Sequence, residues 1–250
     1  LRKGAETIVD QCMKIQDDEH VIVVNDGNDQ DLIDAVLEVV EDRAGSTEYM
    51  EYEEPENHGD EPPQRVAEAM QKADAVIAPT NKSLTHTDAR RDACESGSRV
   101  ATLPGINREI WNTSLQADYS QVKEISEKVY SMLEETSEVR IKTPSGTDLT
   151  FEIDIDLFHT DTGMIDESGD FGNLPAGEAD GGIINVSGVL VTDHFPFAPS
   201  GTKVEIEDSE AVAIEHTDNE GSRLQEAFSN IEGARNLAEF GFGTNPEATL

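Results

Sequence analysis

The sequence predicts an α/β protein: an amino-terminal doubly wound domain with a parallel sheet, followed by a β-rich, mainly antiparallel α+β domain. Two observations support this prediction. In the first half, short apolar runs alternate with longer helical patterns, which is typical of βαβ units. After about residue 137, short alternating runs separated by turn residues dominate, as they do in antiparallel sheets. We therefore expect an α/β domain at 1–137 and a second domain at 138–250.

The elements of the first domain follow from apolar periodicity and from the residues that end each run. Short apolar runs followed by turn residues predict strands at 20–27, 47–52, 74–79 and 98–105. Apolar residues three or four positions apart predict helices at 5–15, 29–45, 64–73, 87–97 and 118–135. We expect Gly45 and Gly97 to end two of these helices and Thr87 to cap the start of one.

The second domain begins with a predicted hairpin, in which "EVRIKT" and "DLTFEIDI" flank the turn "PSG". Further short apolar runs predict strands at 181–191, 203–208, 211–216 and 236–243. One amphipathic segment, "SRLQEAFSNI", predicts a helix before the last of these strands. The second half is therefore expected to be mostly antiparallel sheet.

The charge of the chain excludes some partners. Among its 250 residues, 53 are acidic and 18 are basic, which gives a formal net charge of −35. Such a charge repels nucleic acid and anionic membranes, so we expect neither as a partner. The acids are spread along the chain rather than gathered in a tail, which favours a halophilic protein whose surface stays solvated in concentrated salt. An ordinary acidic protein from a low-salt organism is the alternative.

The cysteines and the apolar runs limit the location of the protein. Cys12 and Cys94 are too few for a disulfide framework or a cysteine zinc site, and each is expected to pack as a small apolar group. No apolar run approaches the roughly 18 residues that span a bilayer, and no signal peptide stands at the start. We therefore expect a cytoplasmic protein. Because the first residue is Leu1, we also expect that the true amino terminus is missing.

Common catalytic and phosphate-binding signatures are absent from the sequence. There is no Walker A motif, no G-x-S-x-G elbow and no H-E-x-x-H, and "DGND" after the first clear strand lacks the spacing of a dinucleotide-binding loop. His86 lies just past a predicted parallel strand, where ligand sites of open sheets gather, and could act as an acid or base. The alternative is a loop that caps the next helix, with Ser83, Thr85, Thr87 and Asp88 as capping groups.

Two glutamates stand in segments rich in glycine and proline. Glu178 lies in "GDFGNLPAGEADGG", a composition that can hold one carboxylate rigidly as a metal ligand. A solvated connecting loop is the alternative. Glu239 lies in "NLAEFGFGTNP" between apolar neighbours. Because a buried carboxylate needs a partner, a metal ion or a hydrogen-bonding network could satisfy it; an outward-facing position on an alternating strand is the third possibility.

Three motifs in this order carry a family resemblance: "SLTHTDARRDACESGSRVATLPGI", "GNLPAGEA" and "NLAEFGFGTNP". With them the chain resembles the thermophilic-type leucyl aminopeptidases, which are metallopeptidases, and their relatives the 2,5-dihydroxypyridine dioxygenases. The match extends over most of the chain from about residue 74, and the acidic composition resembles that of haloarchaeal proteins.

The resemblance implies a metal-dependent aminopeptidase with a metal site in the second domain. By motif match, Glu178 and Glu239 would bind the metal and His86 would act as acid or base. Zinc or cobalt is expected for a peptidase, and iron for a ring-cleaving dioxygenase. The substrate would be a peptide in the first case and a small aromatic molecule in the second, and a homodimer is possible because peptidases of this type are often dimers.

The chain departs from the family pattern in two places. "ADGG" follows Glu178 where the family continues into a more hydrophobic strand, and the late histidine-containing segments of the family are absent before Leu250. We therefore expect that the chain is incomplete at its carboxyl end. A non-catalytic relative that has lost its metal site is the third hypothesis, beside the aminopeptidase and the dioxygenase.

Overall fold

A computed structural model describes residues 1–195, 198–215 and 222–248. Its contacts divide the chain into two compact units, and both units are assembled from separate stretches of sequence. The first unit contains Leu1–Ser126, Asp161–Glu178 and residues 244–248. The second contains Glu127–Thr160 and Ala179–Gly243.

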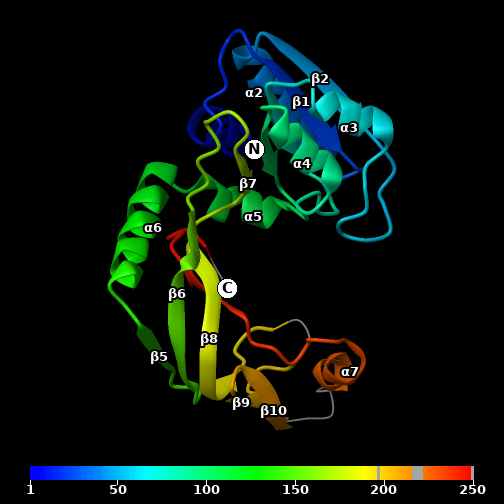
Figure 1. Cartoon of the computed structure of the whole chain (residues 1–250). Coiled ribbons are helices and arrows are strands. Elements are labelled where there is room, and N and C mark those ends of the chain that lie inside the picture. Colours follow the sequence, from blue (N-terminus) through cyan, green and yellow to red (C-terminus); the bar gives the residue numbers. More distant parts are fainter. Residues whose placement is uncertain (196–197, 216–221, 249–250) are drawn as a thin grey trace. The chain divides into compact units, whose positions relative to one another are not determined.

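A parallel sheet forms the centre of the first unit (Figure 1). In the described residues it has five strands in the order β2-β1-β3-β4-β7, and every neighbouring pair is parallel. The strands are β1 (His20–Asn25), β2 (Ser46–Glu51), β3 (Ala75–Ala78), β4 (Arg99–Thr102) and β7 (Phe171–Asn173). The expected α/β fold class is confirmed.

Helices cover both faces of this sheet, as a doubly wound fold requires. Alternate residues of β1 show the two faces: Val21 and Val23 pack into one buried cluster, and Ile22 and Val24 into another. The first cluster includes apolar residues of α1, η1 and α2, and the second includes those of α3 and α4. The helical elements are α1 (Arg2–Glu6), the π-helix η1 (Thr7–Cys12), α2 (Gln30–Arg43), α3 (Gln64–Met70), α4 (Asp88–Glu95), α5 (Arg108–Asn112), the 3₁₀-helix η2 (Ser114–Gln116) and α6 (Tyr119–Glu134).

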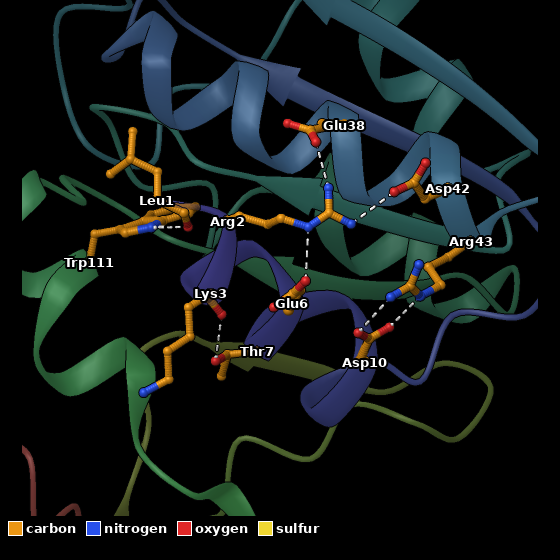
Figure 2. Close-up of polar contacts among 10 residues, drawn as sticks. All are labelled: Leu1, Arg2, Lys3, Glu6, Thr7, Asp10, Glu38, Asp42, Arg43 and Trp111. Atoms are coloured by element: carbon orange, nitrogen blue, oxygen red, sulfur yellow. Dashed lines mark hydrogen bonds and ion pairs between the residues drawn. The ribbon is translucent and has the colours of Figure 1, made fainter.

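The amino-terminal helix is held against α2 by charge, as Figure 2 shows. The Arg2 guanidinium donates to Glu6, Glu38 and Asp42, and these carboxylates raise its pKa, with Asp42 the largest contributor. Next to it, Arg43 donates to Asp10. Such exposed pairs in a protein with excess acid fix the position of a helix more than they stabilise the fold.

The strand β7 was not expected from the sequence. Phe171–Asn173 belongs to the segment rich in glycine and proline that holds Glu178, yet it pairs in parallel with β4, with Thr102 opposite Asn173. It is only three residues long, too short for its own periodicity to mark it as a strand. This pairing brings a late segment of the sequence into the first unit.

The second unit is built on a sheet with the order β10-β9-β8-β6-β5, and β11 also pairs with β8; the described residues give it six strands. The hairpin expected at 138–155 is present as β5 and β6, and the β8–β9 and β9–β10 pairs are antiparallel. These elements are β5 (Glu138–Lys142), β6 (Asp148–Asp161), β8 (Glu178–Val191), β9 (Lys203–Glu207), β10 (Glu210–Glu215), α7 (Ser222–Asn230) and β11 (Glu239–Gly243).

One predicted domain boundary and one predicted strand can be compared with these elements. The expected domain boundary near residue 137 lies between α6 and β5. The strand expected at 211–216 ends with His216, which lies outside the described residues. In the described ranges, no helix combines the length and the apolar character that crossing a membrane would require.

Candidate functional site

A pocket of about 270 Å³ lies in the first unit, at the carboxyl ends of β4 and β7. Its lining comes from η2, the end of β6, the end of β7 and the segment that leads from it to the first residue of β8, and the segment after β11: Ser114, Asp161, Asn173, Pro175, Ala176, Gly177, Glu178, Asn245 and Ala248. The carboxyl edge of a parallel sheet is where ligand sites of open α/β folds gather. The pocket is therefore the candidate functional site.

Two of the sequence motifs meet at Asn173. This residue ends β7, and its Oδ1 accepts hydrogen bonds from the hydroxyls of Thr85 (2.8 Å) and Thr102 (2.5 Å). Thr85 belongs to the "SLTHT" loop after β3, and its hydroxyl in turn accepts from Ser83 at 2.8 Å. Neither threonine lines the pocket, whereas Asn173 does. The network thus holds Asn173 from outside the pocket.

The second and third motifs meet at Gly177. The Asn245 amide donates to the carbonyls of Ala176 (2.8 Å) and Ser114 (3.0 Å), and the Thr244 amide donates to the carbonyl of Gly177 (2.8 Å). Gly177 has φ +129°, and a Cβ there would lie 2.7 Å from Asn245 Cβ. Only glycine allows this backbone conformation and this close approach. The three motifs therefore converge on one pocket.

A buried tyrosine supports the wall of the pocket from behind. The Tyr119 hydroxyl accepts a hydrogen bond from the Ala176 amide at 3.3 Å, and the residue is fully buried. Burial is the main cause that raises the pKa of Tyr119, so the hydroxyl remains protonated. Gly163 lets the chain pass the ring, because a Cβ there would lie 2.3 Å from it.

The charged groups of the pocket are two carboxylates, those of Asp161 and Glu178. In the described part of the chain, no group of three or more His, Cys, Asp or Glu side chains is arranged to hold a metal ion. Glu178 lines this pocket, but the described residues around it do not form a complete metal site, so its role as a metal ligand stays a prediction.

His86 and Glu239 lie elsewhere. His86 is exposed in the loop between β3 and α4 and does not line the pocket. Its neighbour Thr87 caps α4, accepting from the Arg90 amide at 3.2 Å, as the capping alternative expected. Glu239 is the first residue of β11 in the second unit; its side chain is exposed, while Phe240 and Phe242 pack against the core of that unit.

Sequence reasoning missed the polar residues that shape this pocket. Asn173 and Asn245 stand inside the quoted motifs "GNLPAGEA" and "NLAEFGFGTNP", so the signal was present, but asparagine in a glycine-rich segment is also typical of turns. Ser114 and Asp161 carry no local signal, because only the fold brings them to the pocket.

The topological switch point of the same sheet, where open α/β folds commonly have a crevice, is filled by the protein itself. The chain leaves β1 for β2 on one side and later returns to β3 on the other, so the topological switch point lies between β1 and β3. There Asp26, 2% exposed, accepts hydrogen bonds from the backbone amides of Asn81 (2.6 Å) and Lys82 (2.9 Å). The Asn81 and Lys82 amides, which could otherwise bind an anionic ligand, therefore already have the Asp26 carboxylate as their acceptor.

Comparison with known proteins gives one family and two related folds. The sequence matches the 2,5-dihydroxypyridine 5,6-dioxygenase (NicX) family over residues 6–250. No protein with a curated description matches it significantly. The structure is similar to that of 2,5-dihydroxypyridine dioxygenase from Pseudomonas putida KT2440, with a TM-score of 0.78, 17% identity and coverage of 99% of this chain and 77% of the other. AmpT from Thermus thermophilus follows with a TM-score of 0.66, 17% identity, and coverage of 97% and 77%.

Proposed function

The chain belongs to the 2,5-dihydroxypyridine 5,6-dioxygenase family, and from this premise we propose that it acts in the oxidative cleavage of a small hydroxylated aromatic ring. The observation that carries the proposal is the family match, which spans nearly the whole chain. The aminopeptidase expectation thereby becomes the second candidate. A shared fold does not choose between the two, since one fold hosts many chemistries.

The candidate pocket suits a small ring. Its volume of about 270 Å³ is just below the range typical of sites for drug-sized ligands, which is consistent with a single-ring substrate. The negative charge of its carboxylates, Asp161 and Glu178, disfavours anionic ligands, whereas a neutral hydroxypyridine carries no charge that they would repel. The pocket therefore supports the proposal without choosing the reaction.

A divalent metal is the cofactor that the family relationship leads us to propose, with iron for ring cleavage and zinc or cobalt for peptide hydrolysis. Glu178 and Glu239 remain proposed ligands and His86 a proposed acid or base. When bound, the metal would supply the activation of oxygen or of water. The chain's own contribution in the described part is to bind and orient the substrate in the pocket.

The second candidate is a metal-dependent aminopeptidase. The segments around Glu178 and Glu239 resemble the motifs of that group, and AmpT shares the fold. If this function holds, the purified protein loaded with zinc or cobalt releases amino acids from short peptides. If the protein is a non-catalytic relative, neither peptide nor aromatic ring is consumed.

Oxygen uptake tests the proposal directly. The purified protein is loaded with Fe²⁺ and mixed with 2,5-dihydroxypyridine in an oxygen electrode cell, and the loss of the ring absorbance is followed in parallel. We expect enzyme-dependent consumption of oxygen and substrate in equal amounts. Because a protein of net charge −35 repels itself at low salt, the assay includes about 1 M KCl, where the Debye length is about 3 Å.

The controls separate the candidates. The same protein with zinc and an aminoacyl chromogenic substrate tests the peptidase. Release of amino acids without oxygen uptake would overturn the dioxygenase proposal. Metal analysis of the protein as purified gives an independent readout, since stoichiometric metal would exclude a relative without a metal site.

A further inference from the structure

The side-chain amide of Asn173 is held in one orientation. Its Oδ1 receives two hydroxyl hydrogen bonds, from Thr85 and from Thr102, and a carbonyl oxygen has two lone pairs. Because the Thr85 hydroxyl accepts from Ser83, its own hydrogen is available for Asn173. The threonines thus occupy the oxygen end of the amide, and the Nδ2 end remains for the pocket that Asn173 lines.

We propose that Asn173 is the residue that orients the substrate, donating a hydrogen bond from Nδ2 to a carbonyl or hydroxyl oxygen of the bound ring. An amide that is fixed before binding loses little conformational freedom on binding, so it can select a position as well as add affinity. The other asparagine of the pocket cannot do this, because both donors of Asn245 are used by the Ser114 and Ala176 carbonyls.

The charges of the pocket define the class of ligand. The Nδ2 group of Asn173 supplies the donor, and the negative charge of Asp161 and Glu178 disfavours an anion, so the pocket favours a neutral molecule with an acceptor oxygen. A hydroxypyridone meets both demands, and a ring that carries a carboxylate is repelled. The identity of this ligand rests on the proposed function, but the role of Asn173 as the donor rests on geometry.

A substitution can remove the Nδ2 donor of Asn173 and keep the oxygen that accepts from the two threonines. Asn173→Asp retains an oxygen for Thr85 and Thr102 but cannot donate, and its charge repels an acceptor oxygen. We expect it to weaken binding of 2,5-dihydroxypyridine, measured by titration calorimetry under nitrogen, by about tenfold or more. Asn230→Asp, exposed on α7 and outside the pocket, adds the same charge and should change the affinity less than about twofold.

A second variant keeps Asn173 itself. Thr85→Val combined with Thr102→Val removes the hydroxyls that fix the amide, and neither residue lines the pocket. We expect a loss of affinity smaller than that of Asn173→Asp, because the freed amide still donates in part of its orientations. If Asn173→Asp fails to fold, which thermal unfolding would reveal, this double variant still tests whether a fixed Asn173 amide contributes to binding.

Nuclear magnetic resonance observes the donor directly. The ¹⁵N side-chain signal of Asn173, assigned by its absence in Asn173→Asp, should shift when 2,5-dihydroxypyridine is added and should not shift with benzene, which has no lone pair to accept a hydrogen bond. A carboxylated analogue, 6-hydroxynicotinate, should bind more weakly than the neutral ring.

Three results would overturn the inference: equal binding by Asn173→Asp, a bound ring that leaves the Asn173 signal unmoved, or no binding of the neutral ring by the unaltered protein at millimolar concentration. These outcomes are distinct from a failure of the proposed function. Binding that depends on Asn173 without oxygen uptake rejects the function and keeps the donor. Oxygen uptake that is unaffected by Asn173→Asp rejects the donor and keeps the function.

Discussion

Two positions at the carboxyl edge of the same parallel sheet, which we call the first and the second crevice, differ in what fills them. Between β1 and β3, the Asp26 carboxylate takes the backbone amides of Asn81 and Lys82. Beside β4 and β7, the Asn173 oxygen is bound from behind, and a pocket of about 270 Å³ lies in front. The first crevice is satisfied internally, and the second is left open to a ligand.

The difference shows that topology does not by itself locate a ligand site. The switch point between β1 and β3 is the position that the strand order favours, but a buried carboxylate makes it structural. The open pocket arises at the sheet edge, where a strand from later in the sequence is added. If this interpretation is right, substitutions at the first crevice should act on stability, and those at the second should also act on binding.

The largest expected effect is at Asp26. Asp26→Ala leaves two partly buried amides without acceptors, each at a cost of about 1–3 kcal/mol. We expect the free energy of unfolding of the protein to fall by about 2–4 kcal/mol in urea titrations. Asp17→Ala, at an exposed position, should change it by less than about 0.5 kcal/mol. A change below about 1 kcal/mol for Asp26→Ala would show that the first crevice is not held by this carboxylate.

Gly177→Ala should have the next largest effect, and it should reach the pocket. The added Cβ at φ +129° lies against Asn245, and strain of this kind costs about 1–3 kcal/mol. Gly59→Ala is the control, because its φ is +86° with no atom within 4 Å of the added Cβ. We expect urea titration to show a larger loss for Gly177→Ala, and calorimetry to show weaker binding of the ring. Equal losses from the two variants would contradict the close contact.

A smaller effect is expected at Tyr119. Tyr119→Phe removes the acceptor of the Ala176 amide and should cost about 1 kcal/mol of unfolding free energy. Thermal or urea unfolding at constant salt measures it. An unchanged free energy of unfolding would mean that the wall of the pocket does not depend on this hydroxyl.

The smallest effect, with the opposite sign, is expected at Tyr52, which follows β2 near the first crevice. In the described residues its buried hydroxyl has no hydrogen-bond partner. Burial raises the pKa of Tyr52, so the hydroxyl stays neutral. Tyr52→Phe removes an unsatisfied polar group and should leave stability unchanged or raise it by up to about 1 kcal/mol. A clear loss of stability in the same unfolding assay would reveal a partner for this hydroxyl.

Local patterns were sufficient for most of the fold. The period of Leu32, Ile33 and Val36 predicted α2, and the apolar run of β1 predicted a buried strand, because each signal lies within one element. Thr87 was expected to cap α4 and does so. The sequence also placed Glu178 among the candidate functional residues, and it lines the pocket.

By itself, then, the sequence determined the fold class, most elements and the motifs that mark the family. Only the tertiary structure decided that "FGN" adds a strand to the first sheet, that Asn173 lies opposite Thr102, and that Asn245 packs against Gly177 in the wall of the pocket. The physical reason is that periodicity records which residues are buried within an element. Pairing a three-residue strand, or placing an amide between two threonine hydroxyls, depends on partners distant in sequence, and no local pattern encodes them.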